Sequence, residues 1–375
     1  MKKESLKTEM LKPDRLKPAI VMAEDGKGRD RAMDGIRGVA ILLVMLGHCI
    51  VLNGLEEKDP FLYDIIKSVQ MPLFMLVSGF VSAGARGGFS RLVRRAESYL
   101  LPFFSWFVVS YFLARIKGLI QGQTITVSLA DFAGELKALL FQTDRGLWFF
   151  MTLFVITVFM TVSEELSRRF FGGHMAATLV PVGVLYVLTY LQTRTGNTFL
   201  SPSLTLQYMP FYVLGYLRSG SRARNVSPKV EKIFAALCLA LFLVMVILYP
   251  LGRPAASGRE VLIQMLASFL GSVGMFCLLK VALSGDRVSV LSFLGLYTSE
   301  IYVLHFRFAR LLGIGRRTDT IWSFRGFFWL IASVLVMSIL TAVFIFVLER
   351  IPVCRYLLFG KRGKRDRPSK QENKG

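Results

Sequence analysis

Two residues inside the first apolar segment of this sequence have the types needed for acid–base chemistry. Arg37 and His48 are 11 positions apart, which is close to three whole turns of an α-helix, so both side chains project from the same face. About 16 Å separates them along the helix axis. Asp34 lies one turn before Arg37 on nearly the same stripe. An imidazole titrates near neutrality and can serve as a general base, so His48, Arg37 and Asp34 are the candidate catalytic residues.

A second polar group lies in a later apolar segment. Ser299, Tyr302 and His305 follow one another at intervals of three and therefore share a broad helical face. Glu300 lies in the same segment, and a carboxylate inside a membrane needs a partner, for which we expect an arginine of a neighbouring helix. Trp148 opens another apolar segment, where the aromatic belt at a membrane interface is sufficient to explain it.

Guanidinium groups cluster after the second apolar segment. Arg91 and Arg94 are three residues apart and are neighbours on one helical face, and Arg95 follows directly. Two adjacent glycines, Gly87 and Gly88, precede them in what we expect to be an inner loop. Arginine binds phosphate through paired hydrogen bonds, and backbone N–H groups near such glycines also bind anions. These features favour a phosphate site, while the competing interpretation is positive charge that only orients the helices.

Composition defines the elements that must position these residues. The chain has 375 residues, of which 53% are hydrophobic and 19% charged, with a net charge of +21. Soluble domains are usually about 45–50% apolar and about 25% charged. A nucleic-acid-binding domain with this charge would not carry 31 Phe and repeated apolar runs long enough to cross a bilayer. The composition excludes a soluble enzyme, a disordered chain and a DNA-binding module, and it predicts a polytopic membrane protein.

We expect an all-α bundle of about ten transmembrane helices, because a lipid-exposed backbone must satisfy its hydrogen bonds within its own segment. This domain covers 36–348, between basic cytoplasmic tails at 1–35 and 349–375. The sixth segment is short and holds Pro210, and the ninth carries Glu300, so these two are the least regular. The ten segments are 36–54, 69–85, 98–114, 147–163, 175–191, 204–217, 233–249, 261–279, 289–306 and 324–348.

Charge bias orients the bundle. With the N-terminus inside, 32 of the 46 Lys and Arg residues fall on the inner side, which supports an even number of spans and two cytoplasmic termini. The basic tails then fix the topology and contact anionic lipid headgroups. One outer loop departs from the rule, so either this loop folds back to a site or the ninth span is misplaced; its basic residues are Arg307, Arg310, Arg316 and Arg317.

Other common catalytic signatures do not occur in the sequence. The four cysteines have no CxxC or other metal-ligand spacing, so we expect neither a disulfide framework nor a metal site. There is no P-loop, no GxSxG turn and no HExxH motif. His174 follows two glycines in an inner loop and is expected to be solvated.

The motifs resemble those of the acyltransferase family 3 membrane proteins. The run DGIRGVAILLVMLGH, which ends at His48, is similar to the first-helix signature of that family and reproduces its Arg-x10-His pattern. The run MPLFMLVSGF, which begins at Met71, resembles the second-helix motif. The third motif is matched by Arg91-x-x-Arg94, followed by Leu101-Pro102.

Weaker resemblances occur nearer the end of the chain, at 147–149 and along 295–305, so the match covers roughly 30–350. It is specific in the first hundred residues and loose after Phe150. These weaker matches make four further residues candidates for substrate binding: Trp148, Glu300, Tyr302 and His305.

The resemblance implies an O-acyltransferase that moves an acyl group from cytoplasmic acyl-CoA to a hydroxyl of a cell-surface carbohydrate, such as an exopolysaccharide or lipopolysaccharide. Acetyl is the expected group and succinyl the alternative. We expect no permanently bound cofactor, with acyl-CoA, the carbohydrate acceptor and membrane lipid as partners, and no nucleic acid. The polysaccharide-synthesis machinery is a further expected partner. Together with the charge bias, the resemblance implies the bacterial inner membrane.

Roles for the individual residues follow from this implied reaction. Arg91, Arg94 and Arg95 would hold the phosphates of the donor at the inner face. His48 would act as a general base on the sugar hydroxyl or would carry the acyl group transiently. Arg37 would either pair with Asp34 or contact the donor.

Two other interpretations remain at this stage. A transporter or flippase of a polysaccharide, or of its lipid-linked unit, would also have many helices and buried charges, and consumption of acyl-CoA distinguishes it from a transferase. A membrane scaffold with a decayed site is the other, and the intact register of Arg37 and His48 argues against it.

Overall fold

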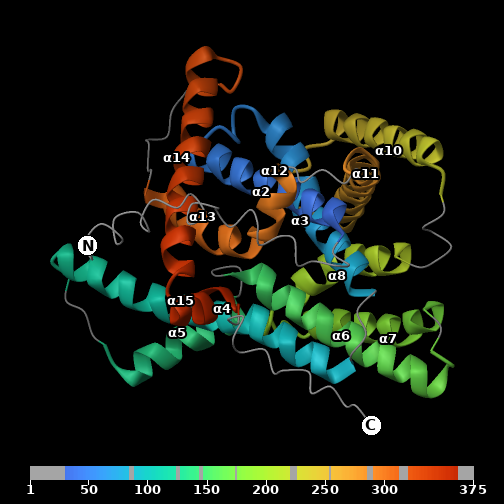
Figure 1. The fold of residues 1–375 in the computed structure, drawn as a ribbon, viewed down its shortest axis with the longest axis horizontal. Coiled ribbons are helices and arrows are strands. Elements are labelled where there is room, and N and C mark those ends of the chain that lie inside the picture. Colours follow the sequence, from blue (N-terminus) through green and yellow to red (C-terminus); the bar gives the residue numbers. More distant parts are fainter. Residues whose placement is uncertain are drawn as a thin grey trace, which may run out of the picture.

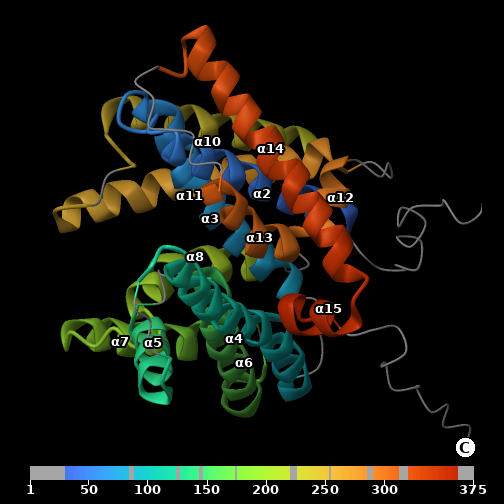
Figure 2. The same ribbon diagram turned by 90° about the vertical axis from the view of Figure 1, so that its left-hand side faces the viewer.

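The computed structural model of the protein describes residues 30–83, 88–123, 127–142, 147–173, 175–219, 226–252, 255–284, 290–311 and 320–361. Across these ranges the regular structure is entirely helical, without a strand, and the predicted all-α fold is confirmed. Figure 1 shows the helices in two groups, with α2, α3, α10, α11, α12 and α14 above and α4, α5, α6 and α7 below. The view in Figure 2 keeps this division, places α8 and α13 between the groups, and shows α15 beside α4 at the lower end of α14.

The bounds of the helices set the frame for the site. In chain order they are α2 (Arg31–Leu52), α3 (Pro60–Ala83), α4 (Gly88–Ile120), α5 (Leu129–Phe141), α6 (Trp148–Phe170), the 3-10 turn η4 (Ala176–Thr178), α7 (Leu179–Arg194), α8 (Pro202–Arg218), α10 (Pro228–Leu248), α11 (Gly258–Ala282), α12 (Val290–Leu296), α13 (Thr298–Leu311), α14 (Phe324–Glu349) and α15 (Pro352–Phe359).

In the described part of the chain, eight helices are long and apolar enough to cross a membrane: α2, α3, α4, α6, α7 with η4, α10, α11 and α14. The other two of the ten expected spans are irregular. α8 has 17 residues, about 26 Å at the helical rise, which is shorter than the hydrocarbon core. The ninth expected span is divided at Tyr297 into α12 and α13. The protein is therefore an integral, polytopic α-helical membrane protein with two irregular segments among its spans.

Several helices extend beyond the expected spans for a common reason. α3 begins at Pro60 rather than 69, and α4 covers 33 residues rather than the expected 98–114. Both helices continue through polar turns, which an apolar-run criterion excludes. α5 and α15 were not expected at all because each is short, with 13 and 8 residues. As a result, the region assigned to a basic tail after 348 begins with a helix.

Two pairs of glycines allow close helix crossings. A Cβ on Gly79 of α3 would lie 1.8 Å from the carbonyl oxygen of Tyr212, and a Cβ on Gly215 of α8 would lie 1.9 Å from that of Leu76. The contact is reciprocal, so α3 and α8 meet backbone to backbone, as small residues permit in membrane proteins.

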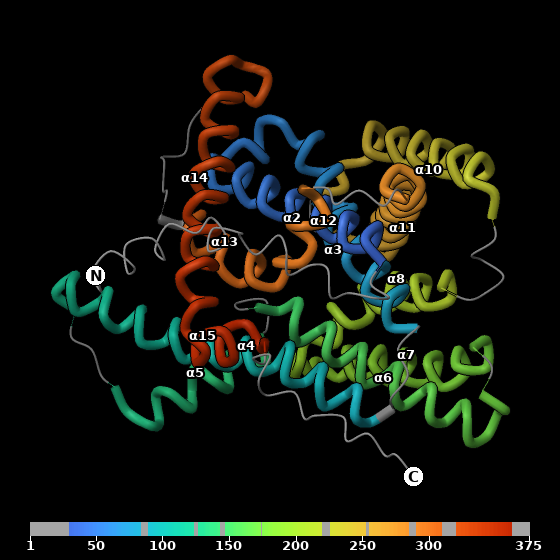
Figure 3. Tube along the Cα trace, viewed as in Figure 1, coloured from blue at the N-terminus to red at the C-terminus, as the bar shows by residue number. Residues whose placement is uncertain are grey.

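A similar crossing joins α2 to α12 beside Arg37. A Cβ on Gly38 would lie 2.0 Å from the carbonyl oxygen of Leu291, and one on Gly295 would lie 1.8 Å from that of Asp34. α12 is thus held against the turn of α2 that carries the Asp34 and Arg37 side chains. The trace in Figure 3 then leads from α12 into α13, which lies beside α14.

Candidate active site

His48 and His305, the two histidines that the sequence motifs single out, lie next to each other in the fold. His48 of α2 and His305 of α13 have ring centroids 5.2 Å apart, and the ring of Phe306 packs edge-on against His48 at 5.0 Å. His48 is half-buried, whereas His305 is 1% exposed. Sequence analysis had given the two residues separate roles, and the structure places them in one site.

The hydrogen bond of His305 fixes its tautomer. Nδ1 lies 2.8 Å from the carbonyl oxygen of Ile301. Because a carbonyl only accepts, Nδ1 of the neutral ring carries the proton and Nε2 carries the lone pair. Nε2 is buried and has no hydrogen-bond partner among the described residues. Buried acceptors in proteins are normally satisfied, so this nitrogen is available for a donor from a ligand or from His48.

The Asp34–Arg37 pair is present at the other end of the same helical face. Arg37 Nη1 lies 3.4 Å from Asp34 Oδ1, and the Asp34 side chain is the more buried of the two. Of the two roles considered for Arg37, the pairing with Asp34 is the one seen. Each residue of the pair also has further interactions in the fold.

Tyr302 connects α13 to the start of α6. Its hydroxyl oxygen accepts a hydrogen bond from the backbone N–H of Phe149 at 3.2 Å, one of the groups that the first turn of a helix leaves unpaired. The Tyr302 ring lies 6.1 Å from that of His305. Next to Phe149, Trp148 stacks on Tyr208 of α8, with centroids 5.3 Å apart. Sequence analysis missed Tyr208, because nothing near it in the chain distinguishes it from other interfacial tyrosines.

Glu300 has a different partner from the one expected. Its side chain is fully buried in the first turn of α13, and it forms an ion pair with Lys361, directly after α15. The predicted arginine of a neighbouring helix was therefore wrong. Lys361 belongs to the region predicted to be a basic cytoplasmic tail. Basic residues in such a tail are explained by membrane topology alone, so the sequence does not single out Lys361 as a partner of Glu300.

The three arginines of α4 have three different environments. Arg91 is 7% exposed; it forms an ion pair with Glu164 of α6 and donates to the carbonyl of Ser82 at 3.2 Å. Arg95 donates to the hydroxyl of Tyr99 at 2.7 Å, and Arg94 is exposed. Arg91 points into the protein while Arg94 is exposed, because the inward stripe of the helix connects 91 with 95. Gly87 lies outside the described residues.

Of the four arginines that depart from the expected bias of basic residues toward the inner side, Arg307 is explained by the structure. α13 continues to 311, so Arg307 lies within a helix and not in an outer loop. It donates to Ser110 Oγ, and its guanidinium lies 5.2 Å from the centre of the Trp106 ring. The ninth segment was thus placed too short at this end. The side chain of Arg310, together with Arg316 and Arg317, lies outside the described residues.

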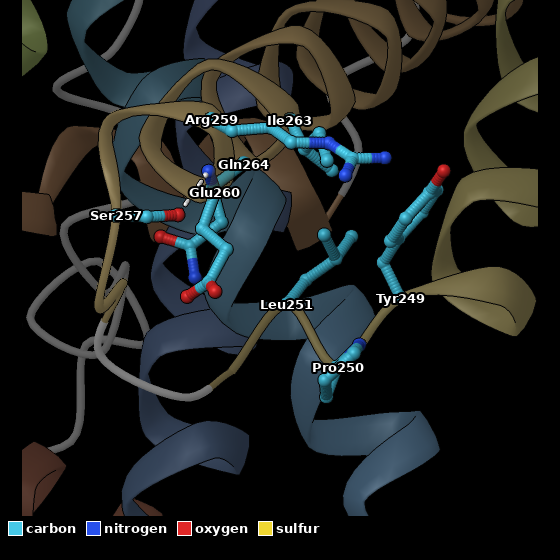
Figure 4. Close-up of a pocket in the computed structure, with 8 residues that line it drawn as sticks. All are labelled: Tyr249, Pro250, Leu251, Ser257, Arg259, Glu260, Ile263 and Gln264. Atoms are coloured by element: carbon cyan, nitrogen blue, oxygen red, sulfur yellow. Dashed lines mark hydrogen bonds between the residues drawn. The ribbon is translucent and has the colours of Figure 1, made fainter.

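A cavity of about 490 Å³ lies away from these residues, where α10 ends and α11 begins. Figure 4 shows Arg259, Glu260 and Tyr249 among the side chains that line it. None of the candidate site residues is among its lining residues, so we do not place the chemistry there. In the described ranges no group of three His, Cys, Asp or Glu residues could hold a metal ion. His174 lies outside those ranges.

A polytopic helical bundle with two facing histidines at its centre defines an integral membrane protein with a site suited to proton transfer. The family model described as "Acyltransferase domain" matches residues 30–347, and the chain belongs to that family of membrane acyltransferases. The match covers every candidate site residue, from Asp34 to His305.

Relatives among well-described proteins cover less of the chain. "Nodulation protein NolL" of Sinorhizobium fredii is 28% identical over 197 residues, which make up 50% of this chain and 48% of the relative. The protein of the same name from Mesorhizobium japonicum is 28% identical over 196 residues, with the same shares. The chain thus matches about half the length of these relatives. No solved structure matches the chain.

Proposed function

We propose that this protein is an O-acyltransferase that moves an acyl group, by default acetyl, from acyl-CoA to a hydroxyl of a cell-surface carbohydrate. The observation that carries the proposal is the facing pair of His48 and His305, with an unpartnered acceptor nitrogen on the buried member. Membership of an acyltransferase family supports the reaction class, and the absence of a conventional serine nucleophile motif is consistent with direct transfer between substrates.

In the proposed reaction, His48 acts as the general base. It removes the proton of the acceptor hydroxyl, the hydroxyl oxygen forms a bond with the thioester carbonyl carbon, and the carbon–sulfur bond breaks. The proton then returns from His48 to the leaving CoA sulfur. His305 Nε2 accepts a hydrogen bond at the same site, from the acceptor hydroxyl or from the His48 ring, and so fixes the orientation of the proton donor. General base catalysis of this type contributes about 10²–10⁴-fold.

For the donor, we propose that Arg94 contacts the phosphates of acyl-CoA. It is the exposed arginine of the three on α4, whereas Arg91 is engaged with Glu164 and Arg95 with Tyr99. Arg91 and Arg95 would then act by holding α4 in place. The Asp34–Arg37 pair lies on the His48 face of α2, where Arg37 would flank the pantetheine arm on its way to the histidines.

For the acceptor, we propose that the half-buried Trp148, held by its stacking on the buried Tyr208, presents aromatic surface to a sugar ring. Aromatic side chains combine a large apolar face with a polar group, which suits the mixed character of a carbohydrate. The stacked pair is joined to the histidines through Phe149 and Tyr302. This arrangement would place a hydroxyl of the bound sugar toward His48.

We further propose that the protein resides in a bacterial inner membrane with both termini in the cytoplasm. The bias of basic residues supports this orientation. It puts Arg94, near the start of α4, at the side where acyl-CoA is made, and His48, near the end of α2, toward the opposite side.

The test uses purified protein in proteoliposomes with radiolabelled acetyl-CoA and the surface polysaccharide fraction of the host. We expect label in carbohydrate with the wild type and with Arg350→Ala, an exposed control, and none with His48→Ala. If an acid quench traps an acyl group on the protein, His48 would be assigned the role of acyl carrier instead of general base. No consumption of acetyl-CoA or succinyl-CoA by correctly inserted wild type would reject the transferase and favour transport of the carbohydrate.

A further inference from the structure

A buried ion pair links the C-terminal segment of the protein to the helix that carries His305. Glu300 is 0% exposed and lies five residues before His305 in α13. Its carboxylate pairs with the ammonium group of Lys361. A charge buried without its partner is strongly destabilising, so the start of α13 depends on a residue that follows α15.

Lys361 contacts more than Glu300. Its Nζ lies 3.4 Å from Glu349 Oε1 at the end of α14 and 5.0 Å from the centre of the Tyr297 ring. Tyr297 occupies the break between α12 and α13. One ammonium group therefore joins the first turn of α13, the break before it and the end of the neighbouring helix α14.

The position of Lys361 is itself fixed by contacts between α15 and α4. Trp106 Nε1 of α4 donates to the carbonyl of Leu358 at 3.0 Å, and Phe359 is 2% exposed. Gly360 has φ +64 and approaches α4 so closely that a Cβ would lie 2.7 Å from the carbonyl oxygen of Glu97. Glycine is the residue suited both to this left-handed conformation and to the close approach. The segment 352–361 is thus anchored to the helix that also carries Arg94.

From these contacts we propose that Lys361 is a positioning residue for the acyl transfer, acting through Glu300 to hold α13 and hence the His305 imidazole against His48. The proposal rests on the proposed function for its activity readout. A shift of about 1 Å in a catalytic group can cost about 100-fold in rate, so a loosened α13 lowers kcat. The donor contact proposed for Arg94 does not involve α13, so KM for acyl-CoA changes little.

The experiment compares Lys361→Met, Lys361→Arg and the control Arg350→Met in purified full-length protein. Arg350 is exposed, lies at the end of α14 and packs on the ring of Phe346, so it serves as a control away from Glu300. We expect Lys361→Met to lower kcat about tenfold or more with KM for acetyl-CoA within about twofold. Lys361→Arg restores the charge and should recover most of the rate. Equal kcat values for Lys361→Met and Arg350→Met would overturn the proposal.

A second measurement tests the contact without activity. Apparent Tm values are recorded for Glu300→Gln, Lys361→Met and the double variant. Lys361→Met leaves the buried Glu300 carboxylate without its cation, whereas in Glu300→Gln the lysine keeps its contact with Glu349. We therefore expect Lys361→Met to lower Tm by several degrees and Glu300→Gln by less, and the double variant should lower it by less than their sum. Additive shifts would overturn the coupling. If the wild type transfers no acyl group, the proposed function fails, while the Tm cycle still decides whether Lys361 supports α13.

Discussion

The imidazoles of His48 and His305 lie 5.2 Å apart, centre to centre, although they come from opposite ends of the chain. Only His305 has both a fixed tautomer and an unpartnered nitrogen. In the proposed mechanism, the half-buried His48 exchanges a proton with substrate and the buried His305 orients it. Because the proposed roles differ, the two histidines give separate predictions.

His48→Ala and His48→Gln should both abolish measurable transfer, with a decrease in kcat of about 10²–10⁴-fold, because neither side chain can accept a proton near neutral pH. Membrane level and apparent Tm should stay close to wild type, since His48 is only half-buried. Initial rates with saturating acetyl-CoA provide the measurement. A variant with wild-type rates would remove His48 from the mechanism.

The role of His305 can be tested with two substitutions, to Asn and to Gln, whose side-chain amides lie near different nitrogens of the imidazole ring. His305→Asn keeps a donor near the Nδ1 position for the Ile301 carbonyl but has no acceptor at the Nε2 position. His305→Gln places an amide near Nε2. We expect the Asn variant to fold and to lose about 100-fold in kcat, and the Gln variant to retain more activity. The reverse order would contradict a role for Nε2.

Arg94 and Arg91 should respond differently to substitution. Arg94→Ala should raise KM for acetyl-CoA by about tenfold, as expected for the loss of about 1.4 kcal/mol from a charged contact, with Tm unchanged. Arg91→Ala should lower Tm instead, because Glu164 would lose its ion pair. Steady-state kinetics and thermal scans in the same detergent separate the two effects. An unchanged KM in Arg94→Ala would place the phosphates elsewhere.

The reciprocal crossing of α3 and α8 should not tolerate a methyl group. Gly79→Ala and Gly215→Ala would each put a Cβ within 2 Å of a carbonyl oxygen, and overpacking of this kind costs at least about 1–3 kcal/mol. Gly183→Ala in α7 is the matched control, because a Cβ there meets nothing within 4 Å. It should be neutral or slightly stabilising. A tolerated Gly79→Ala would mean that the helices are farther apart than described.

The parts of the fold that could be predicted depend on local pattern. Long apolar runs are sufficient to place the eight membrane-length helices, and helical periodicity is sufficient to put Asp34 and Arg37 within reach of each other. The small size of Gly79 likewise predicts a close crossing without naming the partner. In each case the information lies within one helix.

The missed contacts join elements that are distant in the chain. The pairing of Glu300 with Lys361 and the stacking of Trp148 on Tyr208 depend on how helices pack, which periodicity does not specify. The ion pair of Arg91 was missed for a related reason: only the packing of the helices shows that Glu164 faces this arginine. Sequence spacing on α4 alone does not contain that information.

The break at Tyr297 has an electrostatic consequence. Because α13 begins at Thr298, its first-turn N–H groups produce a partial positive charge of about half an elementary charge beside the buried Glu300. Glu300 lies in that first turn, so its carboxylate is stabilised by the dipole of its own helix as well as by Lys361. A continuous ninth helix would carry this positive end to the membrane surface. The interruption therefore moves the field of a helix terminus to within about two turns of the His305 imidazole.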